Sequence, residues 1–173
     1  MSRLIVLRGI TGAGKSTVGR SLAGHGFSVL ELDDVKMEKY GTRTKCIPAE
    51  DFPSFGRQVR SHLEAGRDVV AVEAFVDLEH IDWFLRNAGK QLQDPDVSVV
   101  WLECSVQCSV ERKPGALRER TVRWQHSRIP GRYQVPAELC LHTDTMPVPD
   151  IVGAILAHLE NKRGSTEMHG PLR

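Results

Sequence analysis

Short apolar runs alternate with segments of helical period along most of the chain. The apolar runs, which we interpret as strands, span residues 4–7, 27–32, 68–73, 97–102 and 139–142. Between them, hydrophobic residues recur every three or four positions and predict helices at 16–22, 52–65, 80–92 and 149–159. Residues 37–53 are polar and have no clear period, which predicts a loop. Apolar strands that alternate with helices indicate the α/β class, with a five-stranded parallel sheet covered on both faces.

Length and composition favour a single domain. The chain has 173 residues, so we expect one domain over residues 1–160 and a polar, disordered tail over 161–173. The net charge of +1 gives no general attraction to nucleic acid or to a membrane surface. No segment resembles a signal peptide or a membrane span, and the four cysteines form no paired motif. A cytoplasmic protein with reduced thiols and no membrane partner is therefore expected.

The strongest motif lies between the first predicted strand and the first predicted helix. Residues 9–17 read Gly-Ile-Thr-Gly-Ala-Gly-Lys-Ser-Thr and contain G-x-x-x-x-G-K-S, the P-loop (Walker A) pattern. Its glycines allow backbone N–H groups to turn toward a phosphate at the positive end of the following helix. The side chain of Lys15 reaches the outer phosphates of ATP, and the hydroxyl of Ser16 ligates Mg²⁺. We expect ATP contacts from Gly9, Thr11, Gly12, Ala13, Gly14, Lys15, Ser16 and Thr17.

Acidic residues close the second and third predicted strands. Because ligands of such sheets bind beyond the carboxyl ends of the strands, these residues are candidates for the site. Asp33, followed by Asp34, is placed to act as a general base toward an acceptor hydroxyl, although an aspartate here also suits a helix cap. Glu73 is placed to hold a water bound to Mg²⁺ or to orient the acceptor, unless it simply emerges into solvent.

A basic segment follows the fourth predicted strand. Arg112 and Arg118 lie in it, on either side of a Pro-Gly pair, and we interpret the segment as a lid over the triphosphate. A planar guanidinium suits the charge that spreads over the phosphoryl oxygens during transfer. Glutamates are interleaved with these arginines, so ordinary surface pairing is the competing interpretation. Of the three tryptophans, Trp124 lies beside this segment and is the one expected to touch a ligand.

These motifs together resemble the small P-loop kinases that phosphorylate a hydroxyl. This group includes polynucleotide 5′-kinase, chloramphenicol phosphotransferase, adenylylsulfate kinase and zeta-toxin-like enzymes. The resemblance implies the P-loop NTPase fold and Asp33 as the base. From their positions in the sequence, Lys15 and the lid arginines Arg112 and Arg118 are the further predicted catalytic residues, with at least one of the two arginines at the phosphate. Arg112 is also a predicted ATP ligand.

The chain departs from this group on the acceptor side. Lys36 stands where the polynucleotide kinase branch has an arginine, and lysine is a poorer clamp for a phosphate. That branch has Asp-Thr-Asn where this chain has Glu73, Ala74 and Phe75, so the acceptor pocket is expected to be more apolar. The acceptor-binding signature of the adenylylsulfate kinase branch is absent.

The sequence therefore predicts an ATP- and Mg²⁺-dependent kinase that acts on a hydroxyl of a small molecule. Asp33, Asp34, Lys36, Glu73 and Phe75 are the predicted acceptor-binding residues. Two alternatives stay open: a kinase of nucleic-acid or nucleotide 5′-hydroxyl groups, and an ATPase or nucleotide switch that transfers phosphate only to water.

Overall fold

The sheet has five parallel strands, as the hydrophobic pattern predicts. The computed structural model describes residues 2–112, 114–128 and 139–167. The strands are β1 (Leu4–Arg8), β2 (Ser28–Glu31), β3 (Val69–Val72), β4 (Val97–Glu103) and β5 (Leu139–His142). Their order across the sheet is β2-β3-β1-β4-β5, and every neighbouring pair is parallel. The central strand β1 is fully buried, which explains its uninterrupted apolar sequence.

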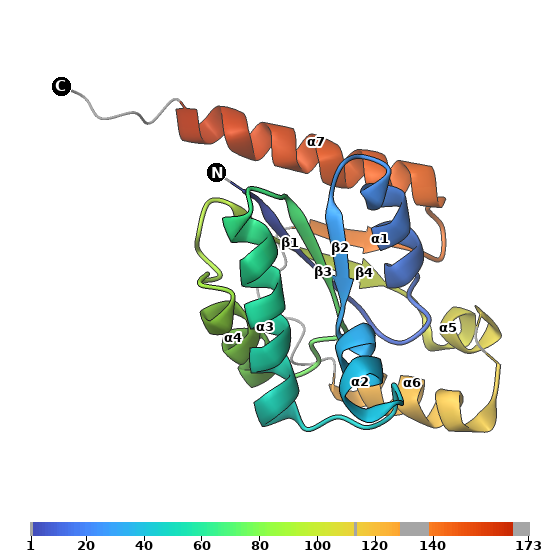
Figure 1. Ribbon diagram of the computed structural model, residues 1–173. Coiled ribbons are helices and arrows are strands. Elements are labelled where there is room, and N and C mark those ends of the chain that lie inside the picture. The colour runs from blue at the N-terminus through green and yellow to red at the C-terminus, as the bar shows by residue number, and fades with distance from the viewer. Residues whose placement is uncertain (1, 113, 129–138, 168–173) are drawn as a thin grey trace.

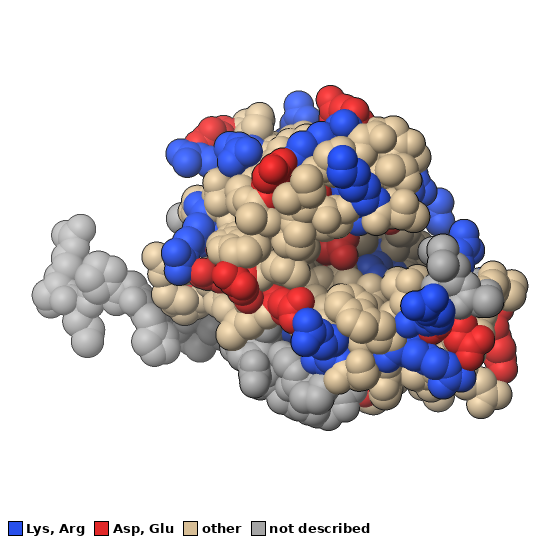
Figure 2. All heavy atoms as spheres, turned by 90° about the horizontal axis from the view of Figure 1, so that it is seen from below, with Lys and Arg blue, Asp and Glu red and all other residues tan. Residues whose placement is uncertain are grey.

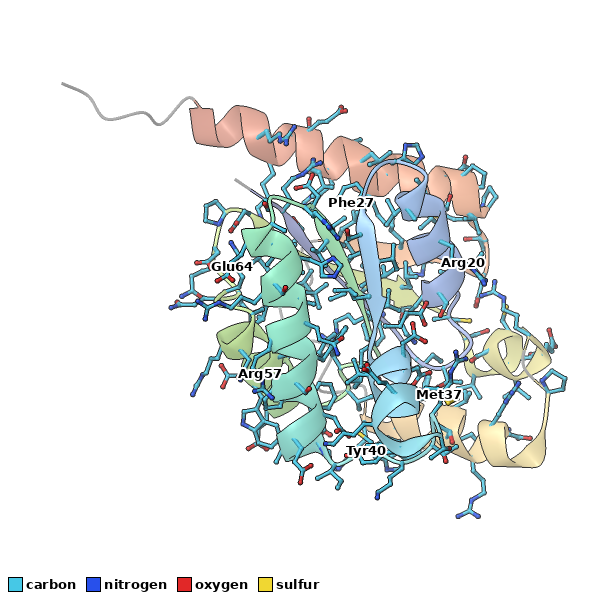
Figure 3. The ribbon with its side chains drawn as sticks, in the orientation of Figure 1. Arg20, Phe27, Met37, Tyr40, Arg57 and Glu64 are labelled. Atoms are coloured by element: carbon cyan, nitrogen blue, oxygen red, sulfur yellow. The ribbon has the colours of Figure 1, made fainter. Side chains whose placement is uncertain are left out.

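Helices cover both faces of the sheet. Helices α1 (Lys15–Ala23) and α7 (Val148–Glu167) pack on one face, where Ile5 and Leu7 of β1 point. Helices α3 (Pro48–Glu64) and α4 (Leu78–Asn87) pack on the other face, against Leu4 and Val6 (Figure 1). The side chains of Arg57 and Glu64 lie on the solvent side of α3 (Figure 3). Alternate residues of one strand thus enter two separate cores.

Three helices lie beyond the carboxyl ends of the strands: α2 (Leu32–Tyr40), α5 (Val106–Arg112) and α6 (Ala116–Arg128) (Figure 1). The end of α2 is tied to the start of α3, because the hydroxyl of Tyr40 donates to a carboxylate oxygen of Asp51 at 2.8 Å (Figure 3). The Asp51 side chain is fully buried and also accepts from the backbone N–H of Ile47. This edge of the sheet is where the sequence predicts the functional site.

The structure corrects two sequence predictions. Residues 37–53 are mostly helical, since α2 runs to Tyr40 and α3 begins at Pro48, which leaves only residues 41–47 as a loop. Proline suits the first turn of a helix, so Pro48 marks the start of α3. The last helix continues to Glu167, so the tail predicted from residue 161 is helical over its first part, and residues 168–173 lie outside the described part. No helix among the described residues is long and apolar enough to cross a bilayer.

Candidate active site

A cavity of about 830 Å³ opens at the carboxyl edge of the sheet. Figure 2 looks onto this edge and shows the hollow, with acidic and basic side chains inside it. The P-loop forms one side through Thr11, Gly12, Gly14, Lys15, Ser16 and Thr17. The start of α2, the segment after β3 and the helix α6 form much of the rest, together with residues of the α2–α3 loop and of α3, α4 and α5. Gly9 and Ala13 are buried and lie outside this lining, so they shape the loop from behind.

Contacts from the loop itself and from α5 and α6 hold the P-loop. Lys15 Nζ donates to the carbonyls of Gly9 at 2.8 Å and Ile10 at 3.0 Å. The hydroxyl of Ser109 donates to the carbonyl of Thr11, whose own N–H donates to Gln125 Oε1 at 2.6 Å. Gly12 has φ +88°, and a Cβ there would lie 2.4 Å from the Ser109 hydroxyl oxygen. Only glycine fits this turn, because a side chain would collide with Ser109. The P-loop backbone is therefore held in one conformation beside the cavity.

Glu31, the last residue of β2, joins the P-loop at the predicted metal position. Its Oε2 accepts a hydrogen bond from the hydroxyl of Ser16 at 2.9 Å, and both residues line the cavity. A hydroxyl and a carboxylate are the hard oxygen donors that Mg²⁺ prefers, so this pair fits a magnesium ion. Sequence reasoning missed Glu31, because it was counted as part of an apolar strand. The available signal was its position at the carboxyl end of a strand, the edge of the sheet at which ligands of this fold class bind.

Asp33 lies in the same cavity as the P-loop. Its Oδ1 is 2.7 Å from Nζ of Lys36, one helical turn later. Lys36 is largely buried, and burial alone would lower its pKa. The negative charge of Glu73 and the hydrogen bond to Asp33 outweigh burial and raise the pKa of Lys36. Lys36 therefore stays charged and holds the Asp33 carboxylate at the cavity wall.

Asp34 is turned away from this site. It is exposed, lies outside the cavity lining, and is 3.4 Å from a guanidinium nitrogen of Arg43. Helix α2 begins at Leu32 and is capped at Glu31, so neither aspartate is the cap residue. Both lie in the first turn, where their negative charge complements the helix dipole.

The segment after β3 supplies the predicted acidic and apolar residues. Glu73 lines the cavity, and its Oε1 accepts from the N–H of Ala74 at 2.7 Å. Phe75 is buried and has φ 44°, which is unusual for a residue that is not glycine. Nη2 of the buried Arg8 donates to the Phe75 carbonyl at 2.6 Å. The hydrogen bond from Arg8 thus stabilises the strained backbone at Phe75. Backbone strain of this kind is often found at functional sites.

The two predicted lid arginines lie in different environments. Arg112 lines the cavity, donates from Nη1 to the Thr143 hydroxyl at 3.0 Å, and lies 3.5 Å from the Gly12 carbonyl. It also donates from Nη2 to the Thr143 carbonyl. Arg118 is exposed on α6 and lies outside the lining, so the structure does not bring it into the site. Surface pairing of the predicted kind does occur on α6, where Arg123 is 2.7 Å from Glu119.

The fold is that of a P-loop NTPase: a parallel sheet of order β2-β3-β1-β4-β5 carries a P-loop after β1, with a cavity beside that loop. The family model described as an AAA domain matches residues 4–127, and the chain belongs to this family. No curated protein sequence matches the chain.

Solved structures share the fold over nearly the whole chain. A gluconokinase from Sinorhizobium meliloti 1021 has a TM-score of 0.69 and 18% identity, and the match covers 98% of each chain. The shikimate kinase of Acinetobacter baumannii, solved with shikimate, has a TM-score of 0.63 and 23% identity over 94% of this chain and 96% of its own. The APS kinase of Mycobacterium tuberculosis, solved with AMPPNP and APS, has a TM-score of 0.67 and 17% identity over 92% and 98%. At these identities the likeness shows the fold alone.

Proposed function

We propose that the protein is an ATP-dependent kinase that transfers the γ-phosphoryl group to a hydroxyl of a small-molecule acceptor. One observation carries the proposal: Asp33 lines the same cavity as Lys15 and Ser16 of the P-loop. A base and a phosphate cradle that share one cavity suit in-line transfer to a third group bound between them. The similar folds of gluconokinase, shikimate kinase and APS kinase support this reading.

Each residue of the site has a separable role in the proposal. The P-loop amides and Lys15 bind and orient the phosphates, and Arg112, next to the P-loop, holds the phosphoryl charge. Asp33 accepts the proton of the acceptor hydroxyl, and Lys36 positions Asp33. Ser16 and Glu31 would hold Mg²⁺, with Glu73 as a further candidate through a water. When bound, the ion supplies positive charge to the β- and γ-phosphate oxygens.

The alternatives predict different products from the same reaction mixture. Labelled ATP is incubated with the protein and, in separate tubes, with small alcohols, with a 5′-hydroxyl oligonucleotide, and with no acceptor. We expect label to appear in a small alcohol. Label in the oligonucleotide would make the chain a nucleic-acid kinase, and release of free phosphate in every tube would make it an ATPase. The Lys15→Ala variant is the matched control and should lose turnover and triphosphate affinity together.

A further inference from the structure

Aromatic side chains cover the part of the cavity that lies away from the P-loop. Phe52 of α3 stacks on His80 of α4, with ring centroids 4.5 Å apart and planes 14° apart. Phe52 also contacts the ring of Phe75 at a centroid distance of 5.6 Å. All three residues line the cavity, and we call them the aromatic wall. Phe52 and Phe75 are only 4% and 1% exposed, so His80, whose side chain is 19% exposed, offers most of the surface that a ligand can reach. Most of a cavity wall's affinity comes from such apolar surface, while a few polar groups set orientation.

The His80 side chain contributes an uncharged imidazole ring to this wall. Burial lowers the pKa of His80, and the negative charges of Asp77, Glu79 and Glu73 together raise it by less. The Asp77 carboxylate is 3.7 Å from Nδ1 of His80. The positive charge of Arg128, on α6, also acts on His80 and lowers its pKa further. At neutral pH the wall therefore presents rings without charge, and the end of α6 lies near it.

Trp124 faces the cavity from α6. Its side chain lines the cavity and is 52% exposed, although large aromatic side chains are usually well covered in a folded domain. Its one described ring contact is with the guanidinium of Arg128, 5.7 Å from the ring centroid. An indole at the mouth of a cavity, with the aromatic wall as the other apolar surface, is suited to cover a flat ligand.

The charges around the aromatic wall disfavour an acidic ligand. Asp33, Glu73 and Asp77 line this part of the cavity. Lys36 is already engaged with Asp33 at 2.7 Å. Arg43 lies in the exposed loop between α2 and α3 and approaches Asp34 at 3.4 Å. Arg128, the cation that acts on His80, has its guanidinium 5.7 Å from the centroid of the Trp124 ring. A carboxylate placed here would meet like charges at short range, and these three cations are already engaged with Asp33, Asp34 and the Trp124 ring.

We infer that the acceptor is an uncharged alcohol with a flat apolar ring, which packs between Trp124 and the exposed His80 side of the aromatic wall. The inference rests on the proposed function, because it names the acceptor of that reaction. The hydroxyl to be phosphorylated points toward Asp33, and the ring replaces water over the wall. This class of acceptor differs from polyhydroxylated acids, which offer a cavity of this kind little apolar surface and a costly negative charge.

Two matched probes test the inference: 4-methylbenzyl alcohol, and 4-(hydroxymethyl)benzoate, which has the same ring and hydroxyl with an added carboxylate. Binding is followed by tryptophan fluorescence, and transfer by labelled ATP. We expect the neutral probe to quench fluorescence and accept label, with a kcat/KM about tenfold or more above that of the carboxylate. In Trp124→Leu, the KM for the neutral probe should rise about five- to tenfold, as loss of an aromatic contact implies. Its KM for ATP should stay within about twofold, while Trp124→Phe should restore most of the lost affinity.

Trp83→Phe is the matched control, because Trp83 lies on α4 outside the cavity lining, and phenylalanine keeps an aromatic ring for its contact with His80, whose ring centroid is 5.6 Å away. In Trp83→Phe, the KM and kcat for both probes should be unchanged. Preference for the carboxylated probe, or no fluorescence change with either probe, would overturn the inference. An equal loss of ATP and probe binding in Trp124→Leu would also overturn it. Transfer to carboxylated alcohols alone would refute the inference and leave the proposed kinase intact, whereas ATP hydrolysis without transfer to any alcohol would refute the kinase.

Discussion

Replacing Gly56 by alanine should separate α3 and α4, the two helices that carry Phe52 and His80 of the aromatic wall. Gly56 lies within α3, and a Cβ at this position would meet the Phe84 carbonyl oxygen of α4 at 2.3 Å. It would also lie 2.8 Å from Cβ of Asn87 and 3.1 Å from the backbone nitrogen of Ala88. Two of these atoms are backbone, so no side-chain rotation relieves the contact. The helices must move apart by about 1 Å to reach an ordinary van der Waals distance.

The size of the effect follows from two opposed terms. Overpacking of a well-packed contact costs about 1–3 kcal/mol. Alanine favours a helix over glycine by about 1 kcal/mol, which offsets part of that cost. We expect the free energy of unfolding of Gly56→Ala to fall by the difference, up to about 2 kcal/mol. For a domain of this size, each kcal/mol lowers the melting temperature by about 2–4 °C.

Gly153→Ala is the control, because a Cβ at Gly153 in α7 would have no neighbour within 4 Å. Urea unfolding followed by circular dichroism should show Gly153→Ala to be more stable by up to about 1 kcal/mol. The two alanine substitutions are thus expected to act in opposite directions. If both stabilise the protein equally, α3 and α4 do not approach at Gly56, and the described placement of Phe52 and His80 is wrong.

Three further predictions follow from single side chains. Glu31→Gln should raise the Mg²⁺ concentration for half-maximal activity about tenfold or more, because a carboxylate of the metal site is lost, and unchanged Mg²⁺ dependence would remove Glu31 from that site. Because burial lowers the pKa of His80, the folded state binds its proton less readily than the unfolded state, and stability is lost as pH falls below the ordinary value near 6.5. His80→Phe should therefore lose less stability than the unsubstituted protein between about pH 7 and pH 5, and equal losses would contradict the assignment. Burial raises the pKa of Cys46 to about 11, so its alkylation by iodoacetamide, followed by mass spectrometry, should still accelerate between pH 8 and pH 10, and a rate that levels off near pH 8 would be inconsistent with this pKa.

The fold could be predicted because its signals are local. Each strand is a short apolar run, and the P-loop is a contiguous motif between a strand and a helix. The region around α2 and the start of α3 was harder, because α2 has only three buried residues, Leu32, Val35 and Lys36. One of the three, Lys36, is charged, and the negative charges of Asp33 and of the distant Glu73 compensate its burial. No hydrophobic period marks such a helix.

The site was harder to predict than the fold, because it depends on contacts between distant segments. The bond between Ser16 and Glu31 joins residues of different elements, and neither residue reveals the other in the sequence. The direction in which an arginine points also depends on tertiary structure. Arg112 turns to Thr143 and the P-loop, whereas Arg118 turns to solvent. Phe75 was recognised as a wall residue from its type, but the support that Arg8 gives its strained backbone was not.

The most direct measurement compares single-turnover phosphoryl transfer in Asp33→Asn and Asp34→Asn with that of the unsubstituted protein. The two aspartates are adjacent on α2, and only Asp33 lines the cavity. Asp33→Asn should slow transfer about 10²- to 10⁴-fold, the usual contribution of a general base, while ATP affinity stays nearly constant and Asp34→Asn remains close to normal. If Asp33→Asn keeps most of its rate, or if both variants lose activity equally, Asp33 is not the base and the proposed kinase mechanism is wrong.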